Sequence, residues 1–181
     1  MSTVSSLLSL HSDQTESREA VAALKDAIGR VESMKILYDK LYKTESYRSI
    51  TVQDYLYNLI DEIYRLFPSC QHVKINRHIE DIEVDARMIF PLGIIMNELL
   101  TNTMKHAFNE CGGGELSIEI KKEKDMLHVR FADNGSGFKQ EAVQERKSFG
   151  LQLIDMLVDQ LTGTYSVTTD AGTEYVFTFP L

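Results

Sequence analysis

The sequence predicts an α+β fold, a two-layer α/β sandwich whose mixed sheet carries helices on one face, preceded by an N-terminal helical hairpin. Beyond residue 50, stretches with the apolar period of a helix are interspersed with alternating stretches typical of strands. The last strands are joined by tight turns, which favours a mixed sheet. We therefore expect residues 1–48 to form the hairpin and residues 49–181 to form the sandwich.

The composition is that of a chain able to bury a core, with 43% apolar and 25% charged residues. With a formal net charge of −8, the chain does not attract the negatively charged phosphates of nucleic acid or anionic lipid, so we expect neither as a partner. The sequence has no membrane-length apolar run and no signal-peptide pattern, which favours a cytoplasmic location. Cys70 and Cys111 lie far apart and in no metal-binding spacing, so neither a disulfide scaffold nor a zinc site is expected.

The N-terminal region has the periodicity of helices that pack on other helices. Apolar side chains recur at alternating steps of four and three, at Ala20, Leu24, Ala27, Val31, Met34, Tyr38 and Leu41. An earlier apolar face at Val4, Leu7 and Leu8, followed by the polar stretch Ser12–Ser17, predicts a first helix and a turn. Because this seam needs a partner, we expect self-association.

The remaining elements follow in order. Thr51 with Asp54 matches a capping box for a helix that stops at Pro68. Asp85 is the expected cap of a long helix reaching about Phe108, with Pro91 near its first turn. Another helix is expected over Phe149–Leu161, and strands are expected at His72–Ile79, Leu116–Ile120, Met126–Ala132, Tyr165–Thr169 and Glu174–Phe179.

The long helix carries a polar stripe. Glu98, Asn102 and either Lys105 or His106 are spaced so that a carboxylate, a carboxamide and a cation share one helix face. This set could hold a hydrated magnesium ion and a phosphate, because Mg²⁺ takes few protein oxygens and keeps waters and phosphate oxygens. A solvated helix face is the alternative.

Three further segments could contact a ligand. In Asp133–Gly137, alternate glycines let the backbone approach a ligand, and Asp133 could accept the exocyclic amine of adenine. The segment Ser148–Leu151 opens a helix whose free N–H groups could bind phosphate. Gly172-Thr173 offers a hydroxyl to a base or a water. The structural alternatives are a turn, an N-cap and a hairpin turn, respectively.

In this order and spacing, the four segments resemble the N, G1 and G2 boxes and the terminal Gly-Thr of the Bergerat ATP-binding fold, over about Thr51–Leu181. That superfamily includes DNA gyrase, the ninety-kilodalton heat-shock chaperone, histidine kinases and MutL repair proteins. Upstream, Ser5–Leu10 and Met34–Tyr42 resemble the dimerisation and phosphotransfer hairpin of sensor histidine kinases of the second HisKA type, the HWE-like group.

The resemblance implies a site for ATP and Mg²⁺. Asn102 would ligate the magnesium that bridges the phosphates, with Glu98 supporting this network. Asp133 would accept the adenine amine. The other implied contacts are Lys105 and His106 beside the phosphates, Gly135 and Gly137 at the base, Ser148, Phe149, Gly150 and Leu151 over the phosphates, and Thr173 at the adenine edge. Glu98 and Lys105 are the implied catalytic residues.

The resemblance also implies an activity, that of the catalytic core of a two-component sensor histidine kinase. This enzyme transfers the γ-phosphoryl group of ATP to a His, for relay to an Asp of a response-regulator receiver domain, and works as a homodimer. In the family the phosphoacceptor His precedes the segment that resembles Ser5–Leu10, and no such His is present here. We therefore expect either a fragment of a longer kinase or a protein that binds ATP without phosphorylating itself. For its location, the resemblance allows either a cytoplasmic protein or the cytoplasmic part of a membrane-anchored sensor.

Two other functions remain open at this point. One is a regulatory module that binds a nucleotide without chemistry. The other is a Ser/Thr kinase of the anti-sigma type, which shares the same boxes but normally lacks a helical hairpin.

Overall fold

The computed structural model describes residues 50–108, 112–137 and 149–181, together with residues 10, 17, 20, 21 and 24. The chain divides by its contacts into two units, Met1–Tyr47 and Arg48–Leu181. In the first unit, Leu10, Ala20, Val21 and Leu24 are helical. The rest of the predicted hairpin lies outside the described residues.

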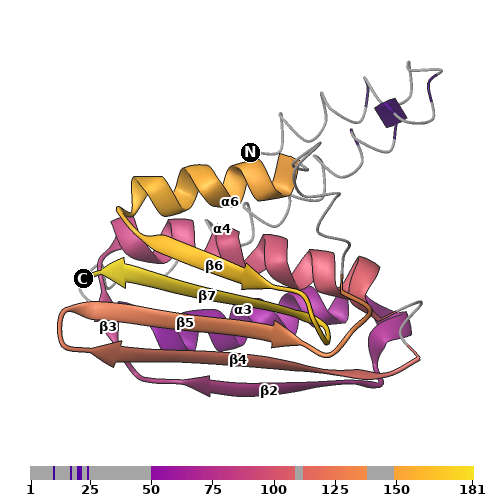
Figure 1. Ribbon diagram of the computed structural model, residues 1–181, viewed down its shortest axis with the longest axis horizontal. Coiled ribbons are helices and arrows are strands. Elements are labelled where there is room, and N and C mark those ends of the chain that lie inside the picture. The colour runs from indigo at the N-terminus through magenta and orange to yellow at the C-terminus, as the bar shows by residue number, and fades with distance from the viewer. Residues whose placement is uncertain are drawn as a thin grey trace. The chain divides into compact units, whose positions relative to one another are not determined.

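The second unit is a two-layer sandwich (Figure 1). The described strands form a five-stranded sheet in the order β2-β4-β5-β7-β6. Only β2 and β4 pair in parallel, so the sheet is mixed. The strands are β2 (Val73–Ile79), β4 (Gly114–Glu123), β5 (Met126–Asp133), β6 (Thr164–Thr168) and β7 (Thr173–Pro180). This arrangement confirms the predicted fold class.

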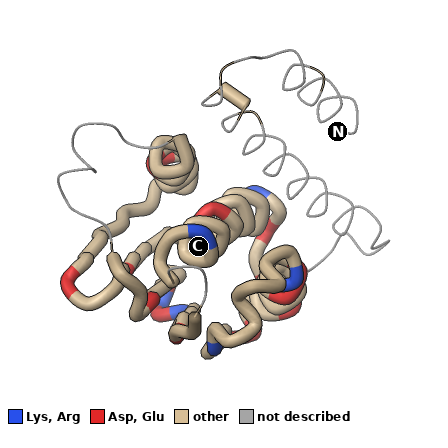
Figure 2. The backbone as a smooth tube through the Cα atoms, turned by 90° about the vertical axis from the view of Figure 1, so that its right-hand side faces the viewer, with Lys and Arg blue, Asp and Glu red and all other residues tan. Residues whose placement is uncertain are grey.

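Helices cover one face of this sheet, as Figure 2 shows from the side. They are α3 (Val52–Arg65), α4 (Ala86–Asn102) and α6 (Phe149–Gln160). Between the layers, β4, β5 and β7 bury alternate side chains, and the largest of these, Phe131, Phe177 and Phe179, are at most 1% exposed. On the opposite face the sheet is polar, with Arg130 paired to Glu119 and Glu174. The alternation of buried and polar positions is what an antiparallel sheet with one solvated face requires.

Two helix starts were correctly predicted from their caps. The Thr51 hydroxyl accepts a hydrogen bond from the Asp54 amide at 3.2 Å and begins α3. The Asp85 carboxylate accepts one from the Met88 amide at 3.0 Å and begins α4. Each cap accepts a hydrogen bond from an amide in the first turn of its helix.

The long helix differs from its prediction at its C-terminal end. The α-helix ends at Asn102 and continues as a π-helical turn, η2 (Thr103–Ala107). Pro91, expected near the first turn, lies inside α4, where its missing N–H removes one backbone hydrogen bond. The expected single α-helix to about Phe108 was therefore wrong in its last turn.

Other departures are smaller. The sequence did not reveal β1 (Ile50–Thr51) and β3 (Glu83–Val84), which pair with each other, or the short 3₁₀-helix η1 (Pro68–Cys70). Cys70 is buried and disulfide-bonded, which the expectation of no disulfide scaffold did not anticipate. Within the described part of the chain, no helix is long and apolar enough to cross a membrane.

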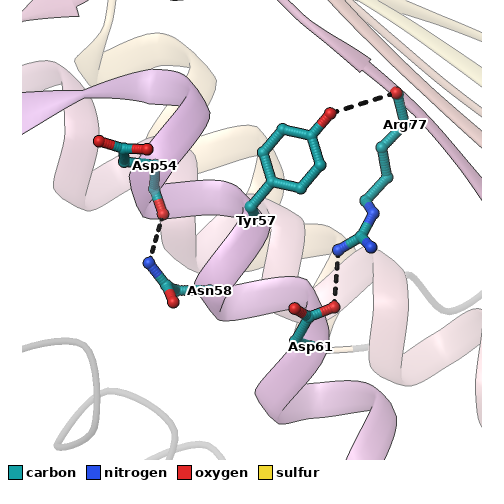
Figure 3. A network of polar contacts seen from close by, with 5 residues as sticks. All are labelled: Asp54, Tyr57, Asn58, Asp61 and Arg77. Carbon is teal, nitrogen blue, oxygen red and sulfur yellow. Dashed lines mark hydrogen bonds and ion pairs between the residues drawn. The ribbon is translucent and has the colours of Figure 1, made fainter.

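The edge strand β2 is closed by side chains of α3 (Figure 3). The Tyr57 hydroxyl donates to the Arg77 carbonyl at 3.4 Å, and the Asp61 carboxylate pairs with the Arg77 guanidinium at 2.6 Å. Gln53 and Tyr64 donate to two more carbonyls of this strand, those of Ile79 at 2.7 Å and Val73 at 3.1 Å. Occupied carbonyls discourage the pairing of another strand at this edge.

Candidate nucleotide-binding site

The four predicted segments come together at one end of the sandwich. α4 and β5 end there, and α6 and β7 begin there, at the right-hand end of the sheet in Figure 1. The convergence follows from chain direction, because β5 pairs antiparallel with β7, so that Asp133 lies opposite Thr173. The end of β5 and the start of β7 therefore lie at the same end of the sandwich as the end of α4.

Asp133 is a buried carboxylate at this end, with 8% of its surface exposed. Its Oδ1 accepts hydrogen bonds from the Gly135 amide at 3.0 Å and the Thr173 amide at 3.3 Å. Its Oδ2 accepts one from the Thr103 hydroxyl at 3.3 Å. Burial raises the pKa of Asp133, while these three donors act to lower it. When ionised, the carboxylate is an acceptor only, which suits recognition of an amine.

The glycines of this region allow close backbone contacts that a side chain would block. A Cβ at Gly135 would collide with the carbonyl oxygen of Ala107, and the Ser136 amide donates to that same oxygen at 2.8 Å. At Gly172, where φ is +107°, a Cβ would collide with the backbone of Asp133. These contacts join the loop after β5 to the end of η2 and to the turn before β7. Gly137, with φ at +63°, lies against the same turn.

The polar residues of α4 and η2 differ sharply in exposure. Glu98 is 2% exposed and Asn102 is half-buried, whereas Lys105 and His106 are exposed. Glu98 and Asn102 lie one α-helical turn apart on a single face. The π-helical turn changes the spacing after Asn102, so the predicted stripe does not continue with ideal helical geometry. The burial of Glu98 is also inconsistent with the alternative of a solvated helix face.

The third segment opens α6. Phe149 is 66% exposed, Gly150 is buried and Leu151 is half-buried. Ser148 lies outside the described residues. The N-terminus of α6 lies at the end of the sheet where β5 ends. The start of this helix and the predicted base-reading carboxylate, Asp133, therefore lie at the same end of the sandwich.

The donor set suits a metal shared with phosphate better than a metal held by protein alone. Among the described residues, no group of three His, Cys, Asp or Glu side chains could hold an ion. Asn102 and Glu98 offer one carboxamide and one carboxylate on the same face. Mg²⁺ accepts such a partial set because phosphate oxygens and waters complete its octahedron.

Sequence reasoning missed Thr103. It is 5% exposed and donates to Asp133, yet it lies directly after Asn102 in a helix without any motif of its own. The only sequence signal is a hydroxyl at a position that the helical pattern assigns to the interior. Thr103 and Asp133 are 30 residues apart in the sequence, so only the folded structure shows that they are in contact.

Two family models match the chain in succession. Residues 1–67 match the HisKA_2 model, described as histidine kinase. Residues 89–181, half of the chain, match the model for the histidine kinase-, DNA gyrase B- and HSP90-like ATPases. The order is that predicted from the motifs.

Two individual relatives that match the chain are protein kinases by name. The sensor histidine kinase PdtaS of Mycobacterium tuberculosis is 28% identical over 194 residues, covering 100% of this chain and 37% of the relative. The serine-protein kinase RsbW of Listeria monocytogenes is 31% identical over 102 residues, covering 48% of this chain and 62% of the relative. The chain thus spans less than half the length of the PdtaS relatives that it matches.

Solved structures have the same fold. The histidine kinase domain of the Erythrobacter litoralis EL346 blue-light activated histidine kinase superposes with a TM-score of 0.77 at 20% identity, covering 100% of this chain and 96% of that one. Histidine kinase AdeS of Acinetobacter baumannii superposes with a TM-score of 0.57 at 12% identity, covering 90% and 80%. With both family models matched in order, the chain belongs to the histidine kinase-, DNA gyrase B- and HSP90-like ATPase family, an ATP-binding family, and within it to the histidine kinases.

Proposed function

We propose that this chain is the catalytic core of a sensor histidine kinase, which transfers the γ-phosphoryl group of ATP to a His side chain for relay to a response-regulator Asp. The observation that carries the proposal is the succession of two family models in one chain, a histidine kinase helical region followed by an ATPase domain. The convergence of the predicted boxes at one end of the sandwich supports it.

Asp133 is proposed to read adenine. Its buried carboxylate would accept a hydrogen bond from the exocyclic amine of adenine. Guanine has a carbonyl oxygen at the corresponding position, so two acceptors would face each other without a hydrogen bond between them. Gly135 and Gly137 allow the loop to lie close to the base, and Thr173 reaches the adenine edge through water. Thr173 is 7% exposed and its amide already holds Asp133, which supports a place in the base pocket.

The phosphates are proposed to lie over α4, η2 and the start of α6. Asn102 would ligate Mg²⁺, with Glu98 supporting it from the helix interior. The ion would neutralise phosphate charge during transfer. Lys105 and His106, which are exposed on η2, would lie beside the phosphates. Ser148, Phe149, Gly150 and Leu151 would close over the phosphates. The protein's contribution to catalysis is then orientation and charge stabilisation of the γ-phosphoryl group.

The N-terminal region is proposed to associate two copies of the chain. Its apolar seam is typical of helices that pack together, and the matching family model covers residues 1–67. A receiver domain of a response regulator is the proposed partner in relay. We propose a cytoplasmic location, in line with the absence of a membrane-length apolar helix among the described residues.

The proposal is tested by supplying a phosphotransfer fragment that contains a His acceptor, together with labelled ATP and Mg²⁺. We expect label on the fragment that is lost in acid and kept in base, since phosphohistidine is acid-labile. Nucleotide binding without any labelled protein would instead identify a non-catalytic regulatory module. Asn102→Ala serves as the inactive reference, and Asn58→Ala, an exposed amide on α3, serves as the matched control.

A second candidate function has its own support. The match to RsbW, a serine-protein kinase, covers 48% of this chain at 31% identity. The HisKA_2 match over residues 1–67 argues against this reading, because it lies in the helical region that the anti-sigma type normally lacks. Acid-stable phosphate on a partner Ser would favour it over the histidine kinase.

A further inference from the structure

We propose that Thr103 is a positioning residue for base recognition, which holds Oδ2 of Asp133 in place to accept the adenine amine. The inference deepens the proposed function and rests on it. It starts from a hydrogen bond between two buried side chains, one from η2 and one from the end of β5. This contact joins η2, which carries the proposed phosphate-contacting residues, to the end of β5, which carries the proposed base-reading carboxylate.

The hydrogen bonds already made to Asp133 determine which of its two carboxylate oxygens can still accept one from a ligand. An ionised carboxylate offers about four acceptor directions. Two donors reach Oδ1, the amides of Gly135 and Thr173, and the Thr103 hydroxyl reaches Oδ2. The direction that remains for a ligand is therefore on Oδ2, the oxygen that only Thr103 holds among the described residues.

The burial of both partners makes this contact important. Thr103 is 5% exposed and Asp133 is 8% exposed, so bulk water does not readily replace a lost donor. Without the hydroxyl, Oδ2 would keep its place only through the amides that hold Oδ1. The carboxylate could then rotate about its last side-chain bond, a soft torsion, and present the base with a poorly aligned acceptor.

Thr103 also has a negative role in base selection. Its hydroxyl hydrogen is committed to Asp133, so it is not available to donate to the carbonyl oxygen that guanine carries in place of the amine. The site thus presents guanine with acceptors only. Loss of the hydroxyl should weaken ATP binding while leaving GTP binding, already poor, nearly unchanged.

The test measures ATP and GTP affinity by calorimetric titration of the full 181-residue chain with Mg²⁺ present, using non-hydrolysable analogues. In Thr103→Val, which keeps the shape and removes the hydroxyl, we expect ATP to bind about tenfold more weakly, equivalent to the loss of about 1.4 kcal/mol, with GTP unchanged. Thr103→Ser restores the hydroxyl and should restore most of the preference. Thr103→Ala, which also removes the hydroxyl, should weaken ATP binding as much as Thr103→Val does if the hydroxyl, and not side-chain packing, is responsible.

Thr164→Val, an exposed Thr on β6, is the matched control and should bind both nucleotides as the unsubstituted chain does. Thermal unfolding of each variant checks that the domain is folded. An unchanged ATP-to-GTP ratio in Thr103→Val, or equal losses for both nucleotides, overturns the proposal for Thr103. Absence of an ATP preference in the unsubstituted chain would instead overturn the role of Asp133 and the proposed function at this site.

Discussion

In the proposed site, the end assigned to the base (the base-reading end) and the end assigned to the phosphates (the phosphate-facing end) are built differently. Asp133 is buried and held by three donors from three separate segments. By contrast, Lys105 and His106 stand exposed on a π-helical turn. The first arrangement holds one carboxylate in a fixed position, whereas the second leaves its side chains room to adjust. If both roles are as proposed, selectivity for the base and affinity for the phosphates are carried by separate parts of one site.

The largest effect is expected at the phosphate-facing end. Asn102→Ala removes the proposed protein oxygen from Mg²⁺. We expect Mg²⁺-dependent ATP affinity to fall about 100-fold, since losing even an outer-shell partner of a metal ligand costs about 10- to 100-fold. The fold should be kept, since Asn102 is half-buried at the end of α4. Calorimetric titration measures the affinity and circular dichroism the fold, with Asn58→Ala as control. Unfolding of Asn102→Ala would show that the side chain is structural.

Removal of magnesium should separate the two ends. With a chelator present, we expect ATP to bind at least about tenfold more weakly while adenosine binding is unchanged, because only the phosphates share the ion. Mg²⁺ titrated without nucleotide should give no measurable heat, since no described cluster of three acidic, His or Cys side chains could hold it. Tight binding of Mg²⁺ alone would contradict a shared metal and the assignment of Asn102.

The base-reading end should respond in selectivity. Asp133→Asn replaces one acceptor oxygen by an amide donor, so we expect ATP to bind about tenfold more weakly and the preference over GTP to shrink. Asp125→Asn, in the exposed turn between β4 and β5, is the matched control. Competition titration with both nucleotides measures the ratio. An adenine preference that survives Asp133→Asn would assign base reading to other groups.

The smallest effect concerns stability and pH. Burial raises the pKa of Asp133 in the folded state, so its ionisation disfavours folding as pH rises through that pKa. The free energy of unfolding of the unsubstituted chain should therefore fall relative to Asp133→Asn between acidic and neutral pH. Chemical denaturation at a series of pH values measures the difference. A difference that grows in the opposite direction would mean that the hydrogen-bond donors outweigh burial.

Several elements could be predicted because their causes are local. Thr51 and Asp85 begin their helices through amides only three residues away, and both starts were correct. The π-helical turn and the pairing of β1 with β3 were not predicted. Residues 103–107 have ordinary helical periodicity, and two-residue strands are too short to show alternation.

The sequence alone predicted the fold class, because periodicity and helix caps are properties of neighbouring residues. It indicated the family through the resemblance of four short segments, in their order, to known boxes. Tertiary structure alone decided the strand order, the burial of Glu98 and the donors around Asp133. Thr103 and Thr173 reach that carboxylate across 30 and 40 residues of chain. Such contacts depend on which strands pair and how helices pack above them, and no local pattern encodes that arrangement.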